Sequence, residues 1–112
     1  MAEVYAFPSG MVDVEGGRST LTLQVKRELV SKSVTIAVTA TPIPTTPVQY
    51  RRSVIIQNNG TNPVYIGGSD VTVANGFPIY PRATIRIDIT DYVIVYGIVS
   101  ANTENLRILE GA

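Results

Sequence analysis

The chain alternates apolar and polar residues over several short stretches. A period of two residues is typical of a β-strand with one buried face. The clearest stretches are 20–26, 33–39 and 84–89. Their apolar residues are Leu21, Leu23 and Val25; Val34, Ile36 and Val38; and Ile85, Ile87 and Ile89. We predict a strand in each, with these residues facing inward and the first two strands joined as a hairpin by a charged connection over residues 27–32.

The rest of the chain continues the same pattern. Further strands are predicted over residues 52–58, 64–66, 71–74 and 106–109, and residues 77–81 are extended and bounded by prolines, which suits a sheet edge. Residues 92–99 are apolar on both faces, which favours a central strand. Turn signals separate these stretches, and no long stretch keeps a helical period. The pattern predicts an all-β fold, an antiparallel β-sandwich of about eight short strands with jelly-roll-like or other Greek-key connections.

The predicted β-sandwich domain covers residues 19–112, with an N-terminal arm before it and a proline-rich segment within it. Residues 1–18 are rich in turn-forming residues, yet they carry apolar side chains, among them Val4, Tyr5 and Phe7. We expect this N-terminal arm to pack on its own domain or on a neighbour.

Residues 41–48 contain three prolines, which favour an extended chain. They are predicted to form a crossover between the N-terminal hairpin and the remaining strands, or a projecting loop.

The amino-acid composition supports the β fold and excludes several kinds of catalytic chemistry. Val and Ile together make 27 of the 112 residues and Leu only 5, and β-branched side chains favour strands. There is no Cys, His or Trp, so thiol, imidazole and redox chemistry are excluded. We expect no catalytic residues, no metal and no cofactor, and therefore not an enzyme. The formal net charge is zero, which argues against nucleic acid as a partner.

Cellular location enters only as an expectation. The first residues lack a basic stretch followed by an apolar run, so no secretory signal is expected. The longest apolar run, residues 93–99, is much shorter than the roughly 20 residues that a membrane-spanning helix needs. We expect synthesis in the cytoplasm and no contact with a membrane.

Four local motifs carry weak functional signals. Residues 16–20 resemble a phosphate loop but lack its spacing and its lysine, so a turn is the better interpretation. Asp70 could contribute to a cation site, and Asp88 with Asp91 forms a carboxylate pair, but turn and surface roles are favoured for all three. Arg51 and Arg52, beside a tyrosine, form the strongest basic cluster. They are predicted to be solvated charges at a strand end or contacts with a partner protein.

Residues 50–110 resemble small β-rich proteins of tailed-bacteriophage virions. The shared features are a strand, an Asn/Gly turn, "Val-Tyr-Ile-Gly-Gly", "Ser-Asp-Val-Thr", "Asn-Gly-Phe-Pro" and "Val-Tyr-Gly-Ile". The turn that carries the family signature consists of Gly67, Gly68, Ser69, Asp70, Asn75, Gly76, Phe77 and Pro78.

The resemblance implies a capsid decoration (cement or head-auxiliary) protein. Such a protein would be located on the capsid surface of the virion and bind the major capsid protein. It would act as a homo-oligomer, with a trimer favoured, and stabilise the head. Candidate contacts with the oligomer or the capsid are Val4, Tyr5, Phe7, Arg51 and Arg52.

Two other functions remain open. The chain could be a tail, neck or receptor-binding accessory protein of the virion. It could instead be a carbohydrate-binding β-sandwich that uses its six tyrosines as stacking faces, although the absence of Trp weakens this alternative.

Overall fold

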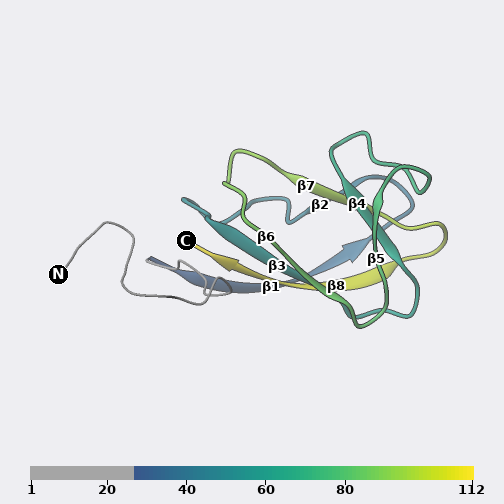
Figure 1. Cartoon of the computed structure of the whole chain (residues 1–112), viewed down its shortest axis with the longest axis horizontal. Coiled ribbons are helices and arrows are strands. Elements are labelled where there is room, and N and C mark those ends of the chain that lie inside the picture. Colours follow the sequence, from purple (N-terminus) through teal and green to yellow (C-terminus); the bar gives the residue numbers. More distant parts are fainter. Residues whose placement is uncertain (1–26) are drawn as a thin grey trace, which may run out of the picture.

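The computed structural model describes residues 27–112, and these residues form eight β-strands and no helix (Figure 1). The described part therefore contains no helix that could cross a membrane. The strands are β1 (Leu29–Ile36), β2 (Thr41–Ile43), β3 (Ser53–Asn58), β4 (Val64–Gly67), β5 (Phe77–Ile79), β6 (Thr84–Ile87), β7 (Val95–Ile98) and β8 (Glu104–Gly111).

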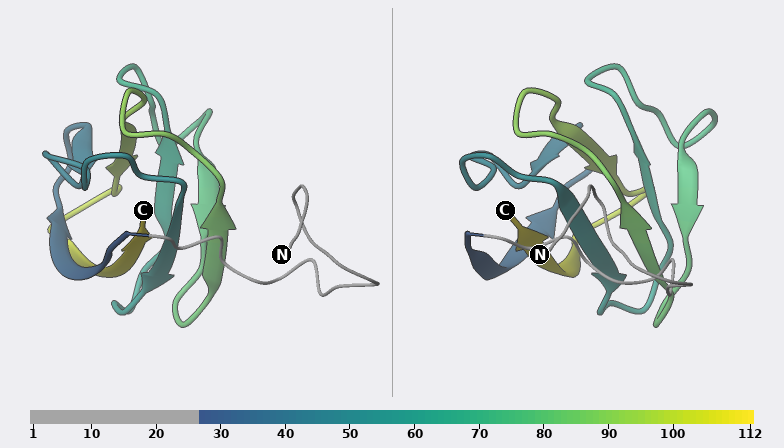
Figure 2. Two further views of the ribbon diagram at one scale, coloured as in Figure 1. Left: turned by 90° about the vertical axis from the view of Figure 1, so that its left-hand side faces the viewer. Right: turned by 60° about the vertical axis from the view of Figure 1, so that its left-hand side comes forward.

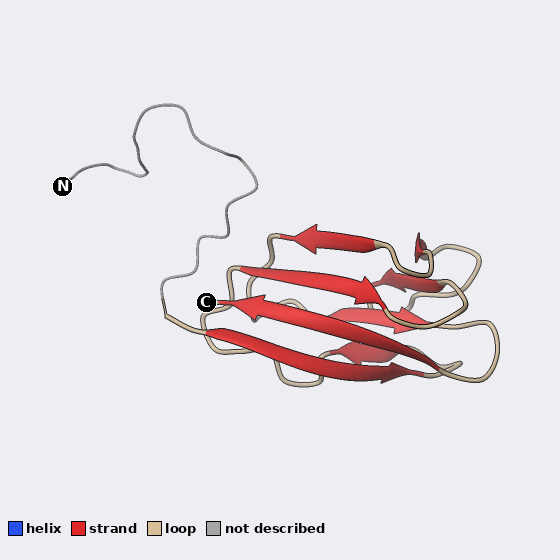
Figure 3. Ribbon diagram, turned by 90° about the horizontal axis from the view of Figure 1, so that it is seen from below, coloured by secondary structure: helices blue, strands red, loops and turns tan. Residues whose placement is uncertain are grey.

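The strands form two four-stranded antiparallel sheets that face each other (Figures 2 and 3). The first, called here the long sheet, has the order β1-β8-β3-β6, and the second, the short sheet, has the order β2-β7-β4-β5. Consecutive strands lie in opposite sheets except for β4 and β5. This strand order is that of a jelly roll, a double-sheet sandwich with two Greek-key connections. The prediction of an all-β, jelly-roll-like sandwich of eight strands is confirmed.

The core lies between the two sheets and consists almost entirely of Ile, Val and Leu. The inward-facing residues of β3 and β8 alternate with polar or half-exposed residues, as a sheet with one buried face requires. The buried cluster comprises Ile36, Ile43, Val54, Ile56, Val64, Ile66, Ile79, Val95, Val99, Leu106 and Ile108. Both sheets contribute to it, which makes the sandwich one packed unit.

Several predicted strands lie where the pattern placed them. β3, β4 and β6 match the predictions for residues 52–58, 64–66 and 84–89 to within two residues at each end. The predicted edge strand at 77–81 is β5, at the edge of the short sheet, and the predicted central strand at 92–99 contains β7, between β2 and β4. The last strand is longer than predicted, because β8 begins at Glu104 and ends at Gly111.

The prediction of a charged connection at residues 27–32 is wrong, because β1 already begins at Leu29. The charge of Lys32 is the reason for the error. Lys32 lies at an inward-facing position of the strand, and its ammonium group reaches the buried Glu110 carboxylate at 2.9 Å. The pairing partner of β1 in the described residues is β8. The other half of the predicted hairpin, residues 20–26, lies outside those residues, as does the arm of residues 1–18.

Two further predictions need correction at chain reversals. Val38 is exposed rather than inward, because β1 ends at Ile36 and the chain turns. In that turn the Thr41 hydroxyl accepts a hydrogen bond from the Ala37 N–H and donates one to the Thr39 carbonyl.

The proline-rich segment does connect the two sheets, but it also contains β2. Pro42 is tolerated there because β2 lies at a sheet edge.

Residues 71–74 form a turn and not the predicted strand. Thr72 and Asn75 hold the backbone in a bend, because each accepts a hydrogen bond from the other's N–H through its side chain, at 2.8 and 3.2 Å. Such local side-chain bonds compete with strand pairing. The turn is closed by a bond from the Gly76 N–H to the Thr72 carbonyl.

The same substitution is expected to lower the free energy of unfolding by different amounts on the two faces of β3. Ile56 is fully buried in the core, whereas Ile55 faces outward and is half-buried. We expect Ile56→Ala to lower the free energy of unfolding by about 2–5 kcal/mol, because it leaves a cavity between the sheets. Ile55→Ala is the matched control and should cost less than half as much. Urea denaturation measures both, and equal losses would contradict the assigned strand orientation.

Candidate functional site

The signature residues form the hairpin between β4 and β5. Gly67 ends β4, the loop occupies residues 68–76, and Phe77 with Pro78 begins β5. The loop is ordered by its own bonds, including one from the Val71 N–H to the Gly68 carbonyl at 3.0 Å. The sequence signature therefore describes one compact loop and the two strand ends that carry it.

Two glycines of this loop are required by close packing. A Cβ atom on Gly76 would lie 2.6 Å from the Tyr65 Cβ and 3.0 Å from the Thr72 carbonyl oxygen. A Cβ atom on Gly67 would lie 3.0 Å from a methyl group of Val71. Val71 is buried although it belongs to a loop. The loop thus folds back over β4 and packs Val71 against Gly67 and Gly76, beside Tyr65.

The outer face of the short sheet carries no charged strand residue. Since Ile43, Val64, Ile66, Ile79 and Val95 point into the core, the alternate residues point outward. We call these outward residues the uncharged face; they are Pro42, Tyr65, Pro78, Tyr96 and Ile98. All five are half-buried.

The strand register brings the residues of the uncharged face together. Tyr96 lies directly opposite Pro42, and Tyr65 lies directly opposite both Ile98 and Pro78. Three separate signature motifs contribute to this face. "Val-Tyr-Ile-Gly-Gly" supplies Tyr65, "Asn-Gly-Phe-Pro" supplies Pro78, and "Val-Tyr-Gly-Ile" supplies Tyr96 and Ile98. The motifs that carry the resemblance thus converge on one surface.

A hollow of about 340 Å³ opens between the two sheets, where the β4–β5 hairpin meets β6 and the connection before β7. Its lining contains no charged side chain and consists of Ile66, Gly67, Gly68, Phe77, Ile87, Ile89, Val93, Ile94 and Val95. Phe77 and Val93 are each more than half exposed, although both are apolar.

The outer face of the long sheet has a different character. It carries Arg86 and Arg107 together with polar residues of β1 and β3 and the apolar residues Leu29, Ile55 and Leu109. The Arg86 guanidinium pairs with the exposed Asp88 carboxylate at 3.0 Å. Interface cores are depleted of charge and enriched in aromatic residues, so the short sheet is the better candidate for a binding surface.

The basic cluster predicted at Arg51 and Arg52 is wrong for Arg51. That side chain is buried, and its guanidinium pairs with the Glu110 carboxylate at 3.0 Å. It also donates to the backbone carbonyls of Thr90 and Val93, at 2.9 and 2.7 Å. Arg51 is therefore an internal structural group, whereas Arg52 is exposed and its predicted partner contact stays a prediction.

A second internal polar cluster fixes the opposite end of the sandwich. The Glu104 carboxylate accepts hydrogen bonds from the Asn62 side chain at 2.7 Å and from the Thr61 N–H at 3.0 Å. The buried Asn58 amide donates to the carbonyls of Asn62 and Ile79. The hydrogen bond from Asn62, followed by that from Thr61, lowers the pKa of Glu104 below its ordinary value of 4.5, against the opposing effect of burial.

The remaining predicted motifs gather no further chemistry. Asp88 is occupied by Arg86, and Asp70 is an exposed loop residue. In residues 27–112 no three carboxylate, imidazole or thiol groups come together as metal ligands would. Residues 16–20 and the arm residues Val4, Tyr5 and Phe7 lie outside the described part.

The five tyrosines within residues 27–112 divide into three kinds of position. Tyr65 and Tyr96 share the uncharged face, Tyr80 and Tyr92 are exposed near chain turns, and the ring of Tyr50 lies 4.3 Å from the Arg27 guanidinium carbon. Sequence reasoning missed the shared face of Tyr65 and Tyr96. The signal was available in part, because both tyrosines alternate with core residues, but pairing β4 with β7 required the tertiary structure.

No known family model matches this chain, and no curated protein is significantly similar to it. The resemblance of residues 50–110 to phage virion proteins therefore stays a prediction.

The buried ion pair predicts a large cost for losing one partner. We expect Arg51→Met to lower the free energy of unfolding by about 3–5 kcal/mol, because it leaves the Glu110 carboxylate buried without its main counter-charge. The matched control is Asp88→Asn, which breaks an exposed pair and should cost about 0–1 kcal/mol. Urea denaturation at neutral pH measures both variants. Similar small losses would show that the pair does not hold the fold.

Because of the Glu104 cluster, we expect the stability of the fold to depend on pH in the acidic range. The folded-state pKa lies below the unfolded value of 4.5, so the carboxylate stabilises the fold fully above that value. This contribution is lost as the pH falls below 4.5 and through the lowered folded-state pKa. We expect Glu104→Gln to be less stable at neutral pH and to lose less of its remaining stability on acidification. Glu28→Gln, at an exposed position, should follow the unsubstituted chain; an unchanged acid response in Glu104→Gln would contradict the role of the cluster.

Proposed function

We propose that this chain is a structural protein of a tailed-phage virion, a capsid decoration protein that binds the major capsid protein on the head surface as an oligomer and stabilises it. A trimer is the favoured oligomer. The observation that carries this proposal is the convergence of three signature motifs on the uncharged face.

The chemistry of that surface fits a protein partner. Two tyrosine rings, two prolines and an isoleucine are presented on a rigid sheet, which limits the entropy lost on binding. A separate apolar hollow between the sheets has room for one or a few apolar side chains, and Phe77 and Val93 stand exposed at it. Buried aromatic anchors surrounded by apolar contacts are the usual source of binding energy in protein interfaces. By analogy only, jelly rolls also occur in viral capsid proteins.

A carbohydrate-binding function is the second candidate. It is favoured by one observation, the pair Tyr65 and Tyr96 on adjacent strands of an exposed face. Jelly rolls also occur in lectins, and an aromatic ring can stack on a sugar. The hollow lacks charged groups, and no strand residue of the uncharged face carries a carboxylate or an amide that would fix a sugar's hydroxyl groups. A protein partner therefore agrees better with the surface.

The matched pair Ile98→Glu and Ile55→Glu tests the proposal. Both residues are half-buried isoleucines that face outward, Ile98 on the short sheet and Ile55 on the long sheet. We expect Ile98→Glu to weaken binding to capsids at least tenfold, equivalent to about 1.4 kcal/mol, because it places a charge in an apolar contact. Ile55→Glu should stay within about twofold of the unsubstituted chain, since a second charge on that face meets solvent.

The measurement is co-sedimentation with heads assembled from the major capsid protein encoded near the gene of this chain. Circular dichroism confirms that each variant is folded. Absence of binding by the unsubstituted chain to heads, together with binding to isolated tails, would favour the tail or neck accessory function. Retention on a glycan array that is lost in Ile98→Glu would favour the carbohydrate-binding function. Equal effects of the two substitutions would remove the uncharged face from the mechanism.

A further inference from the structure

β1 has an unused backbone edge. Glu28 and Ala112 exchange both of their backbone hydrogen bonds, at 3.1 and 2.8 Å. In an antiparallel ladder every second residue bonds to the same neighbour, so residues 30, 32, 34 and 36 of β1 bond to β8. The N–H and C=O groups of the alternate residues point away from β8; these residues are Leu29, Ser31, Ser33 and Thr35. Within residues 27–112, no other strand pairs with β1.

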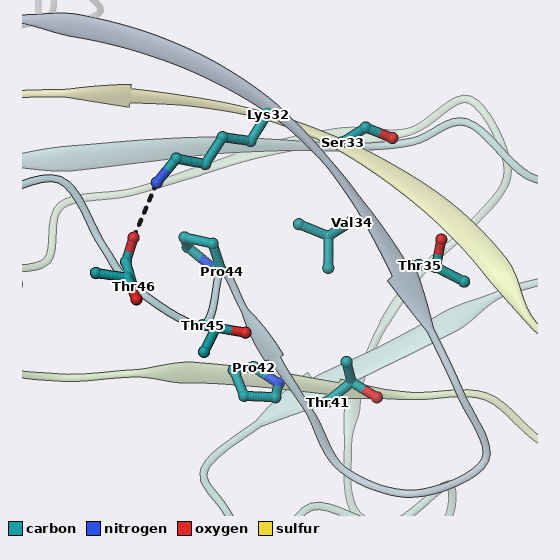
Figure 4. Close-up of a pocket in the computed structure, with 9 residues that line it drawn as sticks. All are labelled: Lys32, Ser33, Val34, Thr35, Thr41, Pro42, Pro44, Thr45 and Thr46. Atoms are coloured by element: carbon teal, nitrogen blue, oxygen red, sulfur yellow. Dashed lines mark hydrogen bonds between the residues drawn. The ribbon is translucent and has the colours of Figure 1, made fainter.

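A groove runs beside this edge, on the open side of the sandwich between β1 and β2 (Figure 4). Its volume is about 600 Å³. Val34, Pro42 and Pro44 give it apolar walls, and hydroxyl groups of Ser and Thr surround them. The Lys32 ammonium, the charged group in the lining, is already bound to the Thr46 carbonyl and to Glu110. The groove thus fits an extended segment that alternates apolar and polar side chains.

The chain itself contains such a segment immediately before the described residues. Residues 20–26 read Thr-Leu-Thr-Leu-Gln-Val-Lys and end one residue before Arg27. They alternate Leu21, Leu23 and Val25 with polar residues, as an edge strand with one covered face does. An exposed strand edge as long as β1 is a ready template for another strand.

This segment is not suited to the β1 edge of its own chain. A two-residue hairpin would have to reverse over Arg27 and Glu28, and its favoured turns need a positive φ angle. Glu28 has no positive φ angle, and the N–H groups of Arg27 and Glu28 both donate to the Ala112 carbonyl, at 2.6 and 3.1 Å. A longer turn would have to include some of the alternating residues of the segment, which could then not pair as a strand. A neighbouring copy does not face this restriction.

We infer that residues 20–26 of one copy add as a strand to the free edge of β1 in a second copy, beside the groove between β1 and β2. Leu21, Leu23 and Val25 then cover Val34 and the prolines, and the backbone groups of Leu29, Ser31, Ser33 and Thr35 gain partners. Such a head-to-tail contact generates a closed ring when the rotation closes. The inference rests on the oligomeric part of the proposed function and names the contact that forms the oligomer.

Disulfide trapping tests the exchange directly, because the chain has no cysteine of its own. One tagged copy carries Thr22→Cys, and a second, differently tagged copy carries Ser31→Cys, Ser33→Cys or Thr35→Cys. We expect at least one of the three mixtures to give a mixed disulfide in at least tenfold higher yield than a mixture with Gln57→Cys. Gln57 is an exposed, outward-facing residue of β3 and serves as the control. Equal yields with Gln57→Cys would overturn the inference, as would a disulfide formed within one chain that carries both cysteines at high dilution.

A proline substitution tests the edge without trapping. The Ser33 N–H points away from β8, so Ser33→Pro removes no backbone hydrogen bond of the long sheet, only the exposed side-chain bond from Asn105 to the Ser33 hydroxyl, and it blocks an added strand. Light scattering of the unsubstituted chain should give a mass at least twice that of one copy, and Ser33→Pro should give the mass of one copy with a β-sheet circular dichroism spectrum. An unsubstituted chain that stays monomeric, or a folded Ser33→Pro variant that still assembles, would overturn the inference. Both measurements use the chain alone, so their result is independent of whether capsids bind.

Discussion

The buried ion pair between Arg51 and Glu110 connects more of the chain than any other polar contact in residues 27–112. Arg51 stands just before β3, and Glu110 lies near the end of β8 on the same side of the core. Through its carbonyl partners Arg51 also binds the connection between β6 and β7, and Glu110 binds β1 through Lys32 and the proline-rich crossover through the Val48 N–H. One pair of charges thus fixes one end of the sandwich.

This ion pair contributes more to the specificity of the strand arrangement than to the net stability of the fold. An ion pair removed from water gains little over a well-packed apolar replacement, whereas a single unmatched charge in the same place is costly. Any alternative strand register that separated Arg51 from Glu110 would leave such a charge in the core. The pair therefore restricts the chain to one arrangement of β8 between β1 and β3, and that arrangement defines the free edge of β1.

The two outer faces of the sandwich differ because the strands of the two sheets carry different residues at their outward positions. The long sheet presents arginines and polar groups together with a few apolar residues such as Ile55, and the short sheet presents tyrosine, proline and isoleucine without any charge. A soluble β-sandwich normally exposes polar residues on both outer faces. The short sheet departs from this pattern, and this departure is the reason for proposing a binding surface there.

Local pattern in the sequence determined the fold class, most of the strands and the direction in which their side chains point. Alternation at residues such as Ile85 and Ile87 is a property of neighbouring residues along one strand, and it needs no knowledge of the partner strand. Three matters depended on partners distant in the sequence, and only the tertiary structure decided them. Lys32 belongs to a strand because Glu110 neutralises it, Arg51 is buried because β8 brings that same carboxylate to it, and Tyr65 shares a surface with Tyr96 because β4 pairs with β7. Charge neutralisation and strand pairing act between residues far apart in the chain, so a reading of local periodicity does not contain them.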